Sequence, residues 1–237
     1  MQLIIIISFS ITSYTFDEDV TDLTFNRLNK FYDKKEKPKE VTKLKKEIKF
    51  LDIKYKVFEI AKLFTEMITT YQVEEGDIIA KEEEKPIWKH SLAYISKDSK
   101  IMYLNGQNDW PTNLISNILF NDPNKINPQQ IDIKKIENDI RSKHIFNFNG
   151  TSFEDADGTK VSISNPGGIS IDGSKYLKGN ENTEKKNLKI PIQKDGKNFN
   201  VAIYPSGKIT FGGRVTDEET ALTIFIKVFD EIRDYIS

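Results

Sequence analysis

The feature that most constrains this 237-residue chain is a short pattern that occurs twice, over His90–Phe120 and over Asn200–Phe229. In each copy, two apolar segments flank a polar turn, and a loop then leads into an apolar helical pattern. Two apolar segments around a tight turn are typical of a hairpin, so the pattern predicts two degenerate hairpin–helix units. We therefore expect an α+β fold, with antiparallel sheets and helices packed on one face.

The second copy carries the clearer signals. Val201–Tyr204 and Lys208–Phe211 enclose a turn at Pro205–Gly207. A capping box formed by Thr216 and Glu219 is expected to start the final helix. The expected apolar face of this helix comprises Leu222, Phe225, Ile226, Phe229 and Ile232.

The segment Val201–Ile232, with the run YPSGKITFGG at 204–213, resembles the end of one half of the TATA-box-binding protein fold. In that family a strand, a Ser-Gly-Lys turn, a second strand and a long helix recur in each half. The first copy here is similar but lacks the turn glycine, because Asp98 and Ser99 stand there. The resemblance implies a saddle of two halves. It does not extend to that family's DNA-contacting residues, since no motif here matches its intercalating Phe pairs.

Two domains are expected, joined near the polar, proline-containing stretch Asn121–Pro128. The first is an N-terminal α+β domain over residues 1–122. The second, over 123–237, is a strand-rich α+β domain that ends in a helix. Within it, Asp195-Gly196 separates the alternating segments Leu188–Ile192 and Phe199–Ile203, which predicts a further hairpin.

The apolar start of the chain, Leu3–Ile7, is expected to be a buried strand that continues to Phe16. The run is too short to span a bilayer, and neither a preceding basic residue nor a small-residue cleavage motif marks a targeting signal. The chain contains no Cys, which excludes disulfides and thiolate metal sites. We therefore expect a cytoplasmic protein that has no membrane partner.

No motif indicates an enzyme. The two histidines, His90 and His144, stand in no nucleophile or metal-ligand pattern, and no phosphate-binding glycine motif is present. We accordingly expect no catalytic residue, no cofactor and no bound metal. A hydrolase or nuclease that uses carboxylates and a divalent metal remains open as a third alternative.

The strongest binding signal is a group of lysines next to and within an expected helix at Val41–Ile68. Apolar residues recur there at three- and four-residue spacing, although alternation over Leu51–Val57 leaves a strand open. Lysines on such a surface can neutralise phosphates. We predict a non-catalytic nucleic-acid-binding or regulatory protein that contacts DNA or RNA through a sheet surface and this Lys-rich helix. The predicted nucleic-acid-binding residues are Lys34, Lys35, Lys39, Lys43, Lys45, Lys46 and Lys49.

The alternative is a protein-interaction or self-associating structural module, such as a virus or a mobile element encodes. It rests on a formal net charge of −1, which gives the whole chain no strong attraction to nucleic acid. It also rests on the many expected strands, whose edges can pair with a protein partner or with a second copy in a homo-oligomer. The acidic segment Val73–Lys85, with a turn at Gly76, is given no role of its own.

Overall fold

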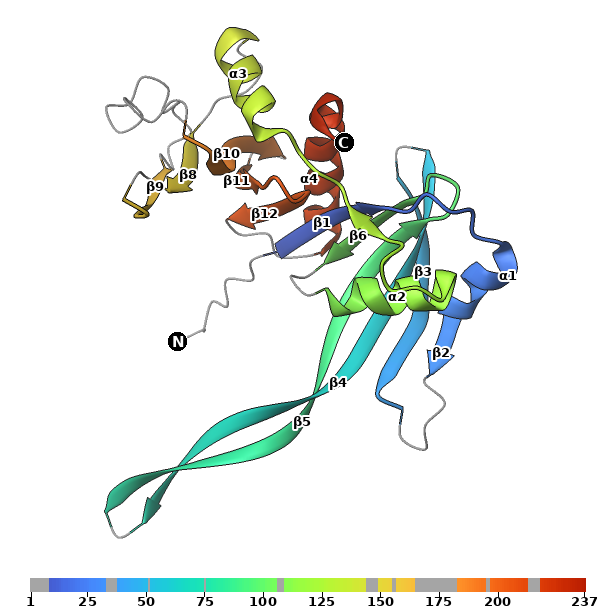
Figure 1. The fold of residues 1–237 in the computed structure, drawn as a ribbon, viewed down its shortest axis with the longest axis vertical. Coiled ribbons are helices and arrows are strands. Elements are labelled where there is room, and N and C mark those ends of the chain that lie inside the picture. The colour runs from blue at the N-terminus through green and yellow to red at the C-terminus, as the bar shows by residue number, and fades with distance from the viewer. Residues whose placement is uncertain are drawn as a thin grey trace. The chain divides into compact units, whose positions relative to one another are not determined.

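A computed structural model of the chain (Figure 1) shows two compact units. Unit 1 comprises the described parts of Met1–Thr15, Asn105–Gln107 and Asn127–Ser237, and unit 2 those of Phe16–Leu104 and Asn108–Ile126. The structure describes residues 9–32, 38–50, 52–74, 76–105, 109–143, 149–154, 157–164, 183–194, 197–212 and 218–237. Antiparallel strand pairs and helices occur in both units, which confirms the α+β class.

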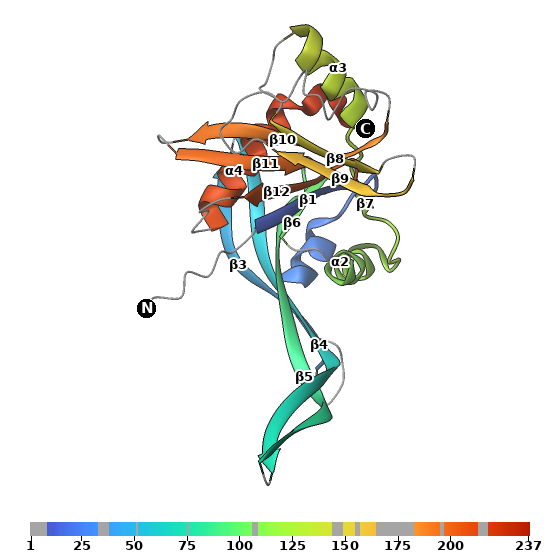
Figure 2. The same cartoon turned by 90° about the vertical axis from the view of Figure 1, so that its left-hand side faces the viewer.

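Unit 1 is a sheet with the strand order β1-β12-β11-β10-β8-β9, and β7 also pairs with β1. Its strands are β1 (Phe9–Thr15), β7 (Asn127–Pro128), β8 (Gly150–Glu154), β9 (Lys160–Ser164), β10 (Lys185–Lys194), β11 (Lys197–Ile203) and β12 (Lys208–Gly212). Its helices are α3 (Ile133–Lys143), α4 (Glu218–Glu231) and the 3-10 helix η2 (Arg233–Tyr235). Helix α4 lies beside this sheet (Figure 2). The core between them includes Ile11, Val201, Ile209, Phe211, Phe225 and Val228.

Two predictions for unit 1 are confirmed. Strands β10 and β11 pair as a hairpin, with Leu188 opposite Ile203 and Ile192 opposite Phe199. The apolar face expected for the last helix is buried along its whole length. The continuation of the first strand is also present, as β1, whereas the segment Leu3–Ile7 and the Thr216 capping box lie outside the described residues.

The C-terminal residues are hydrogen-bonded to other residues of unit 1. Ser237 and Gln130 exchange two backbone hydrogen bonds of 3.0 Å, and the Asp132 amide donates to the Tyr235 carbonyl at 2.9 Å. The Tyr235 hydroxyl donates to the Asp139 carboxylate at 2.8 Å, which links η2 to α3. Burial of the phenol, reinforced by this carboxylate, raises the pKa of Tyr235 to about 12. The phenol therefore stays neutral and keeps donating through the physiological pH range.

Unit 2 is an antiparallel sheet with the strand order β2-β3-β4-β5-β6, which follows the chain. Its strands are β2 (Lys30–Tyr32), β3 (Glu40–Phe50), β4 (Ile53–Glu74), β5 (Asp77–Ser96) and β6 (Ile101–Asn105). Its helices are α1 (Asp22–Phe25), the 3-10 helix η1 (Asn26–Asn29) and α2 (Trp110–Phe120). Strands β4 and β5 are three to four times as long as an average strand, so they extend far beyond their neighbours.

One face of the unit 2 sheet carries the helices. Phe58 of β4 is fully buried and its ring meets that of Phe25 edge-on, with 5.8 Å between centroids. Phe64, farther along β4, meets Trp110 of α2 in the same way at 5.8 Å. Since side chains alternate along a strand, the even-numbered residues of β4 face the helices and the odd-numbered residues face away.

The helix predicted over Val41–Ile68 is wrong, because this segment forms β3 and β4. The physical reason lies in Val57, Phe58 and Ile60, which are all fully buried. Where a strand is buried on both faces, apolar residues follow one another and imitate helical spacing. The alternation of apolar and polar residues over Leu51–Val57 was the signal that correctly indicated a strand.

Candidate functional site

The β4–β5 ribbon is the most unusual element of unit 2. The two strands pair without interruption from Lys56 and Ile95 to Glu74 and Asp77. Strand β3 accompanies β4 only as far as Lys62. In the described part of the chain no other strand pairs with residues 65–74 and 77–86, which we call the ribbon, and Figure 1 shows it extending away from the rest of unit 2.

The ribbon has two faces that differ in exposure. The face opposite to the helices is exposed at every position, and we call it the open face. It consists of Thr65, Met67, Thr69, Tyr71, Val73, Ile78, Ala80, Glu82, Glu84 and Pro86. Tyr71, Val73 and Ile78 are 73%, 74% and 73% exposed, and Val73 lies directly opposite Ile78. Large apolar side chains thus gather at the ribbon end without any cover.

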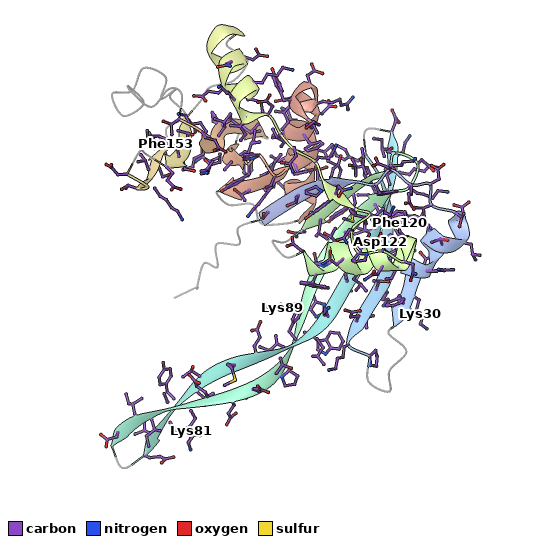
Figure 3. The ribbon with its side chains drawn as sticks, viewed as in Figure 1. Lys30, Lys81, Lys89, Phe120, Asp122 and Phe153 are labelled. Carbon is purple, nitrogen blue, oxygen red and sulfur yellow. The ribbon has the colours of Figure 1, made fainter. Side chains whose placement is uncertain are left out.

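The other face of the ribbon, here called the paired face, carries lysine–carboxylate ion pairs, although its Asp77 makes none with a described residue. Lys81 lies 3.2 Å from Glu74, and Lys85 lies 3.2 Å from Glu83. At the base, Lys89 lies 2.5 Å from Glu66 and its ammonium sits over the ring of Phe64. Figure 3 shows Lys81 near the end of the ribbon and Lys89 near its base. Both lysines of the ribbon, Lys81 and Lys85, therefore already form ion pairs on this face.

The charged side chains of the open face form no ion pairs with described residues. Glu82 and Glu84 lie on it opposite Thr69 and Met67, and neither makes an ion pair with a described residue. Over residues 65–86 the sequence has seven acidic residues and two lysines, a net charge of −5. The open face thus combines exposed apolar side chains with two uncompensated carboxylates.

The described lysines among those expected to bind nucleic acid do not lie on a helix. Lys39 precedes β3, and Lys43, Lys45, Lys46 and Lys49 lie on β3 and are exposed. Lys34 and Lys35 lie outside the described residues. The Lys-rich helix of the sequence analysis is therefore corrected to a Lys-rich strand, for the reason given above for β3 and β4.

Three of these lysines, Lys43, Lys45 and Lys46, are named the lysine strand here. None of the three makes an ion pair with a described residue, whereas Lys49 pairs with Asp52 at 2.7 Å. The pairing of β3 with β4 shifts by one residue between Leu44 and Lys46, so Lys45 is the extra residue of a β-bulge. Three ammonium groups that form no ion pair with a described residue thus lie within four consecutive residues of β3.

A cavity of about 440 Å³ lies at the α1 end of the sheet. Its lining includes Phe25 and the lysines Lys49, Lys54, Lys56 and Lys97. Lys97 is 2.5 Å from Asp22, and this hydrogen bond lowers the pKa of Asp22 and raises that of Lys97. Lys56 lies 3.9 Å from Glu47. The lining carries these four lysines and three acidic residues, Asp22, Glu47 and Asp98, so the cavity presents a formal net charge of only +1 to an anion.

Histidine and carboxylate side chains form few close groups among the described residues. His90 lies 3.5 Å from Glu59, with both side chains about half exposed and no nucleophile beside them. Among the residues described, no three His, Asp or Glu side chains approach closely enough to hold a metal ion. His144 lies outside the described residues. Two surfaces of the described residues stand out in charge and exposure, the open face and the lysine strand.

Sequence reasoning missed the open face. The signal was present as alternation of Met67, Thr69, Tyr71 and Val73, followed by a turn at Gly76 and a return through Ile78. Acidic residues stand around the turn, at Glu74, Glu75 and Asp77, and interrupt the apolar alternation. Two alternating segments around a glycine turn are nevertheless a hairpin signal.

Comparison with known proteins assigns no family to this arrangement. No protein-family model matches the chain, and no curated protein matches it. Within the described ranges, no helix is long and apolar enough to cross a membrane. The arguments for function therefore rest on the geometry and charge of the ribbon and of the lysine strand.

Proposed function

We propose that this chain is a non-catalytic protein-association module that contacts its partner with the open face of the β4–β5 ribbon. The observation that carries the proposal is the exposure of all ten open-face side chains on a ribbon that no other strand of the described residues accompanies. A two-stranded ribbon by itself is marginally stable in water, and gathered exposed apolar side chains mark interaction sites. A partner that covers Tyr71, Val73 and Ile78 would stabilise the ribbon and remove this surface from water.

A site-specific cross-linking experiment tests this function. A photo-reactive phenylalanine analogue is placed at Tyr71 in the full-length chain, and in a matched control at Leu23 of α1, which is 77% exposed. We expect a discrete covalent adduct from position 71, formed in the expressing cell, and none from position 23. The two positions are equally open to solvent, so a difference reports a bound partner rather than exposure. Equal yields at both positions would contradict the proposal.

Nucleic-acid binding through the lysine strand is the second candidate. It is supported by the exposed Lys43, Lys45 and Lys46, which have no ion pair among the described residues. It is opposed by the charge of −5 on the ribbon, which repels phosphates from that part of unit 2. This candidate predicts oligonucleotide binding that weakens steeply with salt and is lost when the three lysines are changed to Glu.

For the architecture, we propose that the two hairpin–helix segments are degenerate copies of one unit. The proposal is supported by the same order of elements in both, since β5, β6 and α2 correspond to β11, β12 and α4. The lengths of β5 and β11 differ because β5 continues into the ribbon. The resemblance to the TATA-box-binding protein family stays a prediction about this repeat and about fold.

A further inference from the structure

We infer that the partner of the ribbon is a second copy of this chain, whose lysine strand receives the open face. This inference rests on the proposed function and names its partner. In each of two copies the ribbon would lie across β3 of the other, with Glu82 and Glu84 next to Lys43, Lys45 and Lys46. The apolar residues Tyr71, Val73 and Ile78 would be covered in the same contact.

The uncompensated charges have the right signs and cannot meet within one chain. Lys43 lies opposite Glu59 on β4, and Glu82 lies opposite Thr69. These two positions on β4 are ten residues apart along one continuous strand, which is about 33 Å at the usual rise. An ion pair needs about 4 Å, so the two groups can only be joined between molecules.

Both groups also lie at or opposite odd-numbered positions of β4. Lys43 and Lys46 are in register with Glu59 and Val57, which are odd-numbered residues of β4 and face away from the helices. The open face carries the odd-numbered residues of β4 as well. In a twofold dimer a contact from one copy to the other is repeated in reverse. Two copies that meet by this face therefore form both ribbon-to-strand contacts at once.

Charge decides between this arrangement and a contact between two ribbons. Two open faces packed against each other would bring together two ribbons that each carry a net charge of −5. Like charges brought together across an interface oppose association. By contrast, residues 38–50 contain five lysines and two acidic residues, a net charge of +3. Attraction between unlike patches thus favours the lysine strand as the surface that the ribbon meets.

The contact is large enough for a stable dimer. A strand of ten residues is about 33 Å long, and two paired strands with their side chains are about 10 Å wide. One open face therefore covers about 330 Å², and the two reciprocal contacts remove about 1,300 Å² of total surface from water. Specific interfaces start at about this size, and the near-neutral chain charge of −1 does not oppose self-association.

Sedimentation velocity on the full-length chain tests the inference. The ribbon variant carries Glu82→Lys and Glu84→Lys, and the strand variant carries Lys43→Glu, Lys45→Glu and Lys46→Glu. We expect the unaltered chain to dimerise and each variant alone to dimerise at least about tenfold more weakly, because like charges then face each other. An equimolar mixture of the two variants is expected to recover the dimer. In that mixture an open face with two lysines meets an acidic strand, and an open face with two glutamates meets a positive strand.

The matched control is Glu66→Lys with Glu83→Lys, which makes the same charge change on the paired face and should leave dimerisation within about threefold. Circular dichroism of each variant checks that the sheet is intact. A mixture that stays monomeric while the unaltered chain dimerises overturns the inference.

Other outcomes separate the inference from the proposed function. A chain that is monomeric at all concentrations, but cross-links from Tyr71 to a different protein, overturns the inference and leaves the function standing. No adduct at Tyr71 contradicts both. Oligonucleotide binding by a monomeric chain, lost in the strand variant, overturns the inference in favour of nucleic acid.

Discussion

Replacing Gly207 with alanine is expected to destabilise unit 1 by about 4 kcal/mol, the largest effect of any single methyl group added to the described glycines. Gly207 has φ +71°, a conformation that costs a non-glycine residue about 1–3 kcal/mol. A Cβ there would also lie 2.3 Å from the Gln129 carbonyl oxygen and 3.3 Å from that of Ser13. Both are backbone atoms, and the Ser13 amide donates to Gly207, so none of the three segments can move alone.

Gly158→Ala is the matched control within the same unit. Gly158 also has a positive φ, +78°, but a Cβ there would meet only a carboxylate oxygen of Glu154 at 3.8 Å. It should therefore lose about 1 kcal/mol, from backbone strain alone. Urea unfolding followed by circular dichroism measures both variants. Equal losses would show that the close approach of Gln129 to Gly207 contributes nothing to the stability of unit 1.

Unit 1 was the more predictable part of the chain. Leu188, Ile190 and Ile192 alternate with polar residues and are followed by a turn pair and a second alternating segment, so pairing and register follow locally. The last helix was predictable for a similar reason, since its apolar residues recur along one face and are buried. What local pattern does not reveal is that Gly207 meets Gln129, a contact between residues 78 positions apart.

Unit 2 was less predictable because burial changes along a single strand. In β4, Val57, Phe58 and Ile60 are all buried, while Tyr71 and Val73 are largely exposed. The same strand therefore shows a continuous apolar run at one end and alternation at the other, and no single period fits it. Which face of the ribbon lacks cover is decided by where β3 and the helices end, which is a property of the tertiary structure.

The candidate site could likewise be predicted only in part from the sequence, as its lysines show. Their positive charge and their exposure follow from composition, and the structure places five of the seven as exposed residues on or next to β3. Their separation from Glu82 and Glu84, and the shared face, depend on the pairing of β3 with β4 and of β4 with β5. A partner for the lysine strand could therefore only be named once the ribbon was seen.

A second copy that covers the ribbon should have a large effect on amide hydrogen exchange. A two-stranded ribbon exposed to water opens readily, because its hydrogen bonds have no packing above them. When a partner lies on the open face, opening the ribbon also requires the partner to leave. Exchange of the ribbon amides should thus depend on protein concentration. Exchange in β11 and β12, which lie inside the sheet of unit 1, should not.

Hydrogen exchange measured by mass spectrometry, on dilute and on concentrated full-length chain, is the most direct test of this account. We expect peptides from residues 65–74 and 77–86 to exchange at least about 100-fold more slowly in the concentrated sample, with β11 and β12 unchanged. The ribbon variant Glu82→Lys with Glu84→Lys should lose this difference. Exchange of the ribbon at the same rate at every concentration would contradict the claim that a second copy lies on the open face.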